Sequence, residues 1–412
     1  MKVKIILLLV LGSCLLFSCH ENDSDYADYI VARPLTISKA DFEASIAVLP
    51  PKYIESSGKI YAYKKYIFVN DKFQGIHVID NRNPNAPKKI AYIKIPGNVD
   101  ISVKNDYLYA DSLSDLIVID ISNMDNIKEV NRLKGVLNEN VVWPAEADFY
   151  EYGDFDYTNE IVIGWETTTE RRRVEEYQNR FEGNFFTMAE AFNDASVGQG
   201  GSLARFKIVD DYLYAVDNHN INVFDIQNLE NPKNLESVFA GFDIETIFNL
   251  GANLFLGSKS GMYIYDITQP ASPTLVSEFQ HGTACDPVVA DENYAYVTLR
   301  GGNSCGATAS ELLIIDIKDL TNPNLLKAYP MDGPYGLGIK DEKIFICDGA
   351  SGLKVYDKTD VNNLVELNHF KDINTFDVIP LETSLLMIGE ETLYQYEYLD
   401  NKIKLLSTLS LK

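Results

Sequence analysis

The chain has 412 residues and a formal net charge of −24, from 60 acidic and 36 basic residues. Such a charge repels the phosphates of nucleic acids and anionic lipid headgroups, so we expect no nucleic-acid partner. A hydrophobic content of 46% is enough for a large core and excludes general disorder.

Residues 1–18 have the pattern of an export signal. Lys2 and Lys4 precede an apolar run over residues 5–11 that is too short to span a membrane. The run leads to Leu-Phe-Ser-Cys at residues 16–19, which resembles the lipobox of bacterial lipoproteins. That resemblance implies cleavage before Cys19 and acylation of Cys19, which would hold the protein on a membrane of the cell envelope, with the outer membrane as the expected location. The alternative is ordinary signal cleavage with an incidental cysteine.

Residues 19–44 are rich in polar and acidic side chains, and we interpret them as a tether between the lipid and the globular domain. The acids just after Cys19 resemble the surface-export signals of Bacteroidetes lipoproteins, although a plain solvated linker explains them equally. Residues 45–49 predict a short strand. We expect it to lie beside residues 403–409 and to help close the domain that follows.

A short strand that ends in an acid recurs along residues 45–412. The acids are Asp80, Asp120, Asp225, Asp266, Asp316, Asp357 and Glu397, at intervals of 40, 105, 41, 50, 41 and 40 residues. A period near 40 with aromatic and aliphatic strands is typical of four-stranded propeller blades. The pattern predicts an all-β fold, a seven-bladed β-propeller of four-stranded blades. Because turn residues follow the acid, we expect its carboxyl group to accept backbone N–H groups of the turn, a structural role.

The interval of 105 residues predicts an insertion after the second blade, at about residues 138–200. Within it, residues 160–165 predict a strand and residues 171–192 a helix, with Val174, Tyr177 and Phe181 on one face. Long insertions in compact domains are often lids or binding loops, and often decoration. The aromatic residues in and near it could stack on sugars or pack the insertion onto the blades: Trp143, Tyr150, Tyr152 and Trp165.

Three cysteines remain after Cys14 leaves with the signal and Cys19 is acylated. In an exported protein we expect a disulfide between Cys285 and Cys305, which would fix the long loop of the fifth unit to its own blade. Cys347 ends a predicted strand, and we expect a buried thiol there. The histidines show no metal-ligand spacing, so the sequence predicts no cofactor and no metal site built on histidine and cysteine.

Several stretches resemble the LVIVD repeat of β-propeller lipoproteins of the Bacteroidetes type, over about residues 45–411. They are residues 97–101 (Gly-Asn-Val-Asp-Ile), 107–111, 116–120, 285–289, 295–300, 334–338 and 347–349. The resemblance implies the propeller fold, and it implies no particular activity.

One register position in each unit predicts the lining of the central channel. Counting back seven residues from each second strand gives a ring of mostly polar residues: Lys59, Asp100, Arg205, Thr246, Asp286, Gly336 and Asp377. Glu245 replaces Thr246 if that unit is one residue longer. Three carboxylates and two cations could hold a cation or a polar ligand. The alternative is that these residues face channel water and pair with one another.

Motifs of nucleophilic, metal-dependent and nucleotide-dependent enzymes are absent from the sequence. We therefore expect a membrane-anchored, non-enzymatic binding or scaffolding platform with an unknown protein or glycan partner. The first alternative is an extracellular hydrolase or lyase acting on a glycan or lactone, with Asp100, Arg205, Asp286 and Asp377 at the channel mouth. The second is a structural subunit of an envelope complex.

Overall fold

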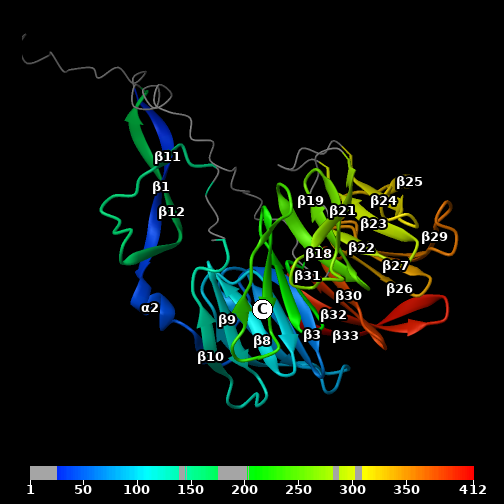
Figure 1. Ribbon diagram of the computed structural model, residues 1–412, viewed down its shortest axis with the longest axis horizontal. Coiled ribbons are helices and arrows are strands. Elements are labelled where there is room, and N and C mark those ends of the chain that lie inside the picture. The colour runs from blue at the N-terminus through cyan, green and yellow to red at the C-terminus, as the bar shows by residue number, and fades with distance from the viewer. Residues whose placement is uncertain are drawn as a thin grey trace, which may run out of the picture. The chain divides into compact units, whose positions relative to one another are not determined.

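The computed structural model describes residues 26–138, 144, 146–174, 202, 204–281, 287–301 and 309–412. The chain divides into two compact units (Figure 1). The smaller unit joins residues 1–37 to residues 142–193, and the larger unit contains residues 38–141 and 194–412. In the described part of the chain, no helix is long and apolar enough to cross a membrane.

The larger unit is a multi-bladed β-propeller, which confirms the predicted fold class. Its described residues form seven antiparallel sheets whose strands run from inner to outer in chain order, except that β2 adds to the outer edge of the first sheet. The first three contain β2 (Ala47–Leu49), β3 (Ser57–Tyr63), β4 (Tyr66–Asp71), β5 (Gly75–Asp80) and β6 (Lys88–Lys94); β7 (Ile101–Lys104), β8 (Tyr107–Ser112), β9 (Asp115–Asp120) and β10 (Lys128–Leu133); and β13 (Phe206–Val209), β14 (Tyr212–Val216), β15 (Asn220–Asp225), β16 (Lys233–Asn234) and β17 (Val238–Phe239).

The remaining sheets repeat the four-stranded arrangement. They contain β18 (Ile244–Leu250), β19 (Asn253–Ser258), β20 (Gly261–Asp266) and β21 (Thr274–Gln280); β22 (Val288–Ala290), β23 (Tyr294–Leu299), β24 (Glu311–Asp316) and β25 (Asn324–Pro330); β26 (Leu337–Lys340), β27 (Lys343–Cys347), β28 (Leu353–Asp357) and β29 (Val365–Phe370); and β30 (Thr375–Pro380), β31 (Ser384–Gly389), β32 (Thr392–Leu399) and β33 (Lys402–Ser410).

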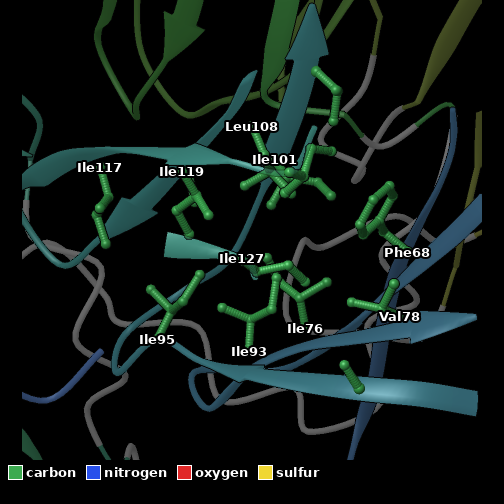
Figure 2. Close-up of a cluster of buried hydrophobic side chains, with 14 residues drawn as sticks. Phe68, Ile76, Val78, Ile93, Ile95, Ile101, Leu108, Ile117, Ile119 and Ile127 are labelled. Atoms are coloured by element: carbon green, nitrogen blue, oxygen red, sulfur yellow. The ribbon is translucent and has the colours of Figure 1, made fainter. Parts of the chain in front are cut away.

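The blades close into a ring. Each innermost strand contacts the innermost strand of the next blade, in the order β3, β7, β13, β18, β22, β26 and β30, and β30 contacts β3. Apolar side chains fill the space between neighbouring blades. Figure 2 shows one such cluster, in which Phe68, Ile76 and Ile93 of the first blade pack against Ile101 and Ile119 of the second. Both faces of each middle strand are thereby buried, which a single blade could not achieve.

The turns after the third strands confirm the structural role of the repeated acid. Oδ1 of Asp80 and Oδ1 of Asp120 each accept a bond of 2.9 Å from the backbone N–H two residues later. The same bond occurs at the other strand-end aspartates, Asp225, Asp266, Asp316 and Asp357. These carboxylates lie on the turns, so they are not channel groups.

The sequence predicted the wrong pairing partner for the short strand over residues 45–49. β2 pairs with β6 at the outer edge of the first blade, with Val48 opposite Ile93, and it does not pair with the last blade. The last blade already has four strands in register, so the side of β32 away from β31 is taken by β33. The segment before the first blade and the segment after the last blade are joined by an individual hydrogen bond instead: the N–H of Ile54 donates to the carbonyl of Leu411 at 2.9 Å.

The tether predicted over residues 19–44 is largely folded in the part that the structure describes. β1 (Tyr26–Ser38) is the middle strand of a three-stranded sheet with β11 (Phe149–Tyr150) and β12 (Glu160–Arg173), and α2 (Lys39–Glu43) follows it. The N–H of Ile30 donates to the Asp148 carboxylate at 2.7 Å. The acidic composition of this segment gave no sign of a strand. Its pairing partners lie more than a hundred residues away in the sequence, so local sequence could not reveal them.

The predicted helix over residues 171–192 is wrong at its beginning. Arg171, Arg172 and Arg173 continue β12 as strand residues, and residues 175–192 lie outside the described residues. Cross-strand ion pairs explain the extended conformation. Arg172 binds Glu151 and Glu170 at 2.6 Å each, and Arg33 of β1 binds the same two carboxylates. On the other face, Trp165 packs edge-to-face against Tyr150 and Tyr152.

Candidate functional site in the central channel

The structure brings five of the predicted ring residues into buried positions at the inner ends of the blades: Lys59, Asp100, Thr246, Gly336 and Asp377. The closest pair is Lys59 and Asp100, whose Nζ and Oδ2 atoms are 2.6 Å apart, with each side chain only 4% exposed. The Asp100 carboxylate also accepts bonds from the backbone N–H groups of Ile101 at 2.7 Å, Phe206 at 2.8 Å and Arg205. Asp100 is therefore saturated by donors of the chain itself.

Asp377 lies on β30, which contacts the strand of Lys59 across the ring closure, and it is completely buried. Its Oδ1 accepts a bond of 3.3 Å from the backbone N–H of Ser202, and its Oδ2 has no hydrogen-bond partner among the described residues. Gly336 is the neighbouring ring position. A Cβ atom there would lie 2.2 Å from Oδ1 of Asp377, so only glycine leaves room for this carboxylate.

The middle of the ring contains a segment of the chain, formed by Ser202 and residues 204–206. Ser202 is 4% exposed, and its Oγ accepts a bond of 2.9 Å from the N–H of Leu337. The carbonyl of Ala204 accepts a bond of 2.7 Å from Ile247 of β18. The segment thus bonds to two different blades of the ring, and we call it the channel segment. It is the return from the insertion to the third blade.

Burial shifts the pKa values of the ring groups Lys59 and Asp377 and of Asp111, which bonds to the backbone N–H of Asp100. Desolvation lowers the pKa of the Lys59 ammonium to about 8, and the neighbouring Asp100 carboxylate partly opposes this shift. Desolvation raises the pKa of Asp111 to about 6, although the N–H groups of Asp100 and Val99 bond to it. Desolvation also raises the pKa of Asp377 well above its usual range. Charge in the ring is therefore costly, and Lys59–Asp100 is the one close ion pair between ring positions that the structure describes.

The structure gives the remaining predicted site residues different positions. Glu245 lies at a β-bulge between Ile244 and Thr246, and Thr246 is the buried residue of the two. Arg205 enters the ring through its backbone N–H, because it belongs to the channel segment. Several predicted positions lie outside the described residues: Cys19, Cys285, Cys305 and Asp286. Cys347 is a buried free thiol in β27, as the sequence predicted.

Sequence reasoning missed a second recurring acid, at the end of the second strand. Oδ1 of Asp111 accepts the N–H groups of Val99 and Asp100 at 2.8 and 2.9 Å, and Asp71 accepts those of Glu55 and Ser56 at 3.0 Å. Equivalent residues bind loop N–H groups in other blades: Asp217, Ser258 and Asp348. The same 40-residue period was the signal that could have identified them. They anchor loops of the blades through backbone N–H groups.

The described residues contain no group of three or more histidine, cysteine or acidic side chains placed to hold a metal ion. The ring also gives little support to acid–base catalysis in its described part. Asp100 is saturated by four donors, and Asp377 is completely buried and accepts a bond from the Ser202 N–H. A catalytic carboxylate needs access to its substrate.

Comparisons with known proteins bear on the repeat and the fold. Residues 97–134 and 281–330 match the family model of the LVIVD repeat. No curated protein matches the chain. Among solved structures, the chain is similar to the computationally designed Ika8 protein, with a TM-score of 0.50 and 11% identity over 88% of this chain and 89% of that one. Hsv2 of Kluyveromyces lactis gives a TM-score of 0.47 and 10% identity over 89% of this chain and 100% of its own. At such identities, similarity concerns the fold alone.

Proposed function

The chain belongs to the LVIVD-repeat β-propeller proteins, and on this premise we propose that it is a non-enzymatic binding or scaffolding platform of the cell envelope. The observation that carries the proposal is the occupied channel. The carboxylates that a channel enzyme would use bind the backbone of the channel segment instead. What remains for recognition is the outer surface of the blades and the inserted unit, with an unknown protein or glycan as the partner.

The anchor of this platform is the acylated Cys19. It is supported by the basic start, the apolar run and the Leu-Phe-Ser-Cys ending of residues 1–19. Labelling cells with an alkyne fatty acid tests it. The full-length protein should incorporate the label and fractionate with membranes, and Cys19→Ala should lose both properties. A wild-type protein that carries no fatty acid would contradict the anchor and leave the platform itself to a separate test.

That separate test is cross-linking of the full-length protein in intact envelopes, followed by identification of the captured proteins, with parallel assays on glycan and lactone substrates. A platform should give a reproducible partner and no turnover. Turnover that disappears in the double variant Asp286→Asn, Asp377→Asn would instead establish the hydrolase or lyase alternative.

A further inference from the structure

Two exposed phenylalanine rings lie together on the segment that joins the third blade to the fourth. Phe239 is 60% exposed and Phe242 is 64% exposed, and their ring centroids lie 5.6 Å apart in an edge-to-face arrangement. The His219 ring packs edge-to-face against Phe242 at 5.4 Å. We call Phe239, Phe242 and His219 the aromatic patch. Single exposed apolar residues are normal on a protein surface, but apolar rings gathered in one place commonly mark a binding site.

The backbone beneath the aromatic patch holds the rings in place. The N–H of Ala240 donates to the His219 carbonyl at 2.7 Å, and Nδ1 of His219 lies 3.2 Å from the Gly241 carbonyl oxygen. Gly241 has a φ of 129°, and a Cβ atom there would lie 3.1 Å from Cζ of Tyr263. Conformation and space therefore both favour glycine at this position. Because the segment between β17 and β18 is fixed in this way, little ordering entropy is lost when a ligand covers the rings.

The polar groups beside the rings can bind a neutral ligand. A carbonyl oxygen can only accept, so Nδ1 of His219 donates to Gly241, and Nε2 is the acceptor of the neutral ring. The exposed Asn218 offers an amide, which both donates and accepts. The carboxylate of Asp243 lies 4.0 Å from the Lys259 ammonium, so these two charges offset each other.

The size of the aromatic patch distinguishes between classes of partner. A covered aromatic side chain buries about 150–250 Å², so rings that are 60% and 64% exposed offer roughly 250 Å². A stable protein interface requires about 800 Å² from each partner. A sugar ring is similar in size to an aromatic ring, and it has C–H groups on its faces and hydroxyl groups around its edge. The net charge of −24 disfavours anionic sugars.

We propose that the aromatic patch is a binding site for a neutral sugar ring of a glycan. The C–H face of the sugar packs on Phe239 and Phe242, and its hydroxyl groups bond to His219 and Asn218. This inference rests on the proposed platform function and narrows it, because it names a glycan as the partner and places the contact on the third and fourth blades.

Glycan binding by the detergent-solubilised full-length protein tests the site. The probes are oligosaccharides of glucose, galactose, mannose, xylose and N-acetylglucosamine on an array, with sulfated forms of the same chains as the charged arm. At least one neutral chain should bind, and its sulfated form should bind more weakly. Phe242→Ala should raise the dissociation constant about tenfold, whereas Phe242→Tyr keeps the ring and should change it less than threefold.

Leu275→Ala is the matched control. Leu275 is an exposed apolar residue of β21 in the fourth blade, and its removal should leave the sugar affinity unchanged. Equal affinities of the wild type and Phe242→Ala would overturn the site, and so would the failure of every glycan on the array to bind.

The cross-linking experiment separates this inference from the platform function. If no glycan binds and Phe242→Ala abolishes capture of a protein partner, the patch is part of a protein interface, so the sugar site is wrong and the platform stands. Turnover of a glycan or lactone would contradict the platform, and the array does not depend on that result.

Discussion

Two aspartates recur in the blades, and their carboxyl groups lie at different depths. The strand-end acid, for example Asp120, lies on a turn, and its bond to Ser122 lowers its pKa. The second-strand acid, for example Asp111, is 2% exposed, and burial raises its pKa to about 6. The strand-end acid stabilises a turn as an exposed carboxylate. The second-strand acid stabilises a loop although burial disfavours its charged form.

The first residue-scale prediction concerns the turn after the third strand. Asp120→Ala should lower the free energy of unfolding by about 1 kcal/mol, because the Ser122 N–H loses its acceptor. Asp120→Asn keeps an acceptor oxygen and should cost clearly less. Urea unfolding of the three proteins checks this. An equal loss in both variants would assign the effect to charge, for instance to the weak pairing with Lys128 at 3.7 Å.

The second residue-scale prediction concerns pH. The folded-state pKa of Asp111, about 6, exceeds the usual 3.8, so the folded form holds a proton that the unfolded form has already released. The contribution of Asp111 to stability is therefore fully present below pH ~4 and is lost as pH rises to ~6, by about 3 kcal/mol at most. Asp111→Asn keeps an acceptor and does not titrate, so its stability should fall less over this range. Parallel pH profiles in the two proteins would contradict the assignment.

At the scale of elements, each blade is protected at its edge and bonded to the next one. The outer strands of most blades carry a β-bulge opposite the end of the third strand, which makes that part of the edge a poor template for a further strand. In the first blade, β2 pairs with the part of β6 beyond the bulge. The Tyr109 hydroxyl donates to the Leu229 carbonyl of the next blade, and Tyr214 donates likewise to Pro270. Gln395 repeats this bond across the closure, to Pro84 of the first blade. The last interface is therefore built like the others.

A prediction for this closure uses two leucines near the chain end. Leu411 is fully buried in the cluster that joins the last blade to the first, and its carbonyl accepts bonds from Ile54 and Lys89. Leu411→Ala should lower the free energy of unfolding by about 2–4 kcal/mol. Leu405→Ala is the control, because Leu405 is 45% exposed on the neighbouring strand and should cost less than about 1 kcal/mol. Equal losses would show that the ring does not depend on this junction.

At the scale of the whole molecule, the chain builds two units from interleaved segments. β1 of the smaller unit has its partners β11 and β12 in the insertion, so neither segment forms that sheet alone. The propeller has its own buried clusters between successive blades, closed by the cluster around Ile60, Val69, Leu386 and Ile388. The larger unit therefore contains the contacts that a separate domain requires.

This division predicts the outcome of deletions. A chain that starts at Ser38 and has a short Gly-Ser bridge in place of residues 142–193 should unfold cooperatively, with a melting temperature within about 5 °C of the full chain. A chain that lacks only residues 142–193 keeps β1 without its partners and should aggregate more readily. Calorimetry and light scattering measure both effects. Loss of cooperative unfolding in the first variant would show that the propeller depends on the smaller unit.

Features repeated along the chain were determined by the sequence alone. The 40-residue period identified the third strands and the turn acids such as Asp225, because a blade is a local unit whose strands follow one another in order. The buried thiol of Cys347 followed from the same register. A sequence repeat therefore shows which residues every blade requires.

Contacts that occur once, between segments far apart in the sequence, could be found only in the tertiary structure. Ser202 and Asp377 are 175 residues apart, and Ile30 and Asp148 are 118 apart. Neither pair belongs to a periodic pattern, so local sequence gave no sign that a strand lies in the acidic leader or that the chain fills its own channel. Closure of the ring brings such residues together, and it is the folded whole that determines which polar groups remain for a partner.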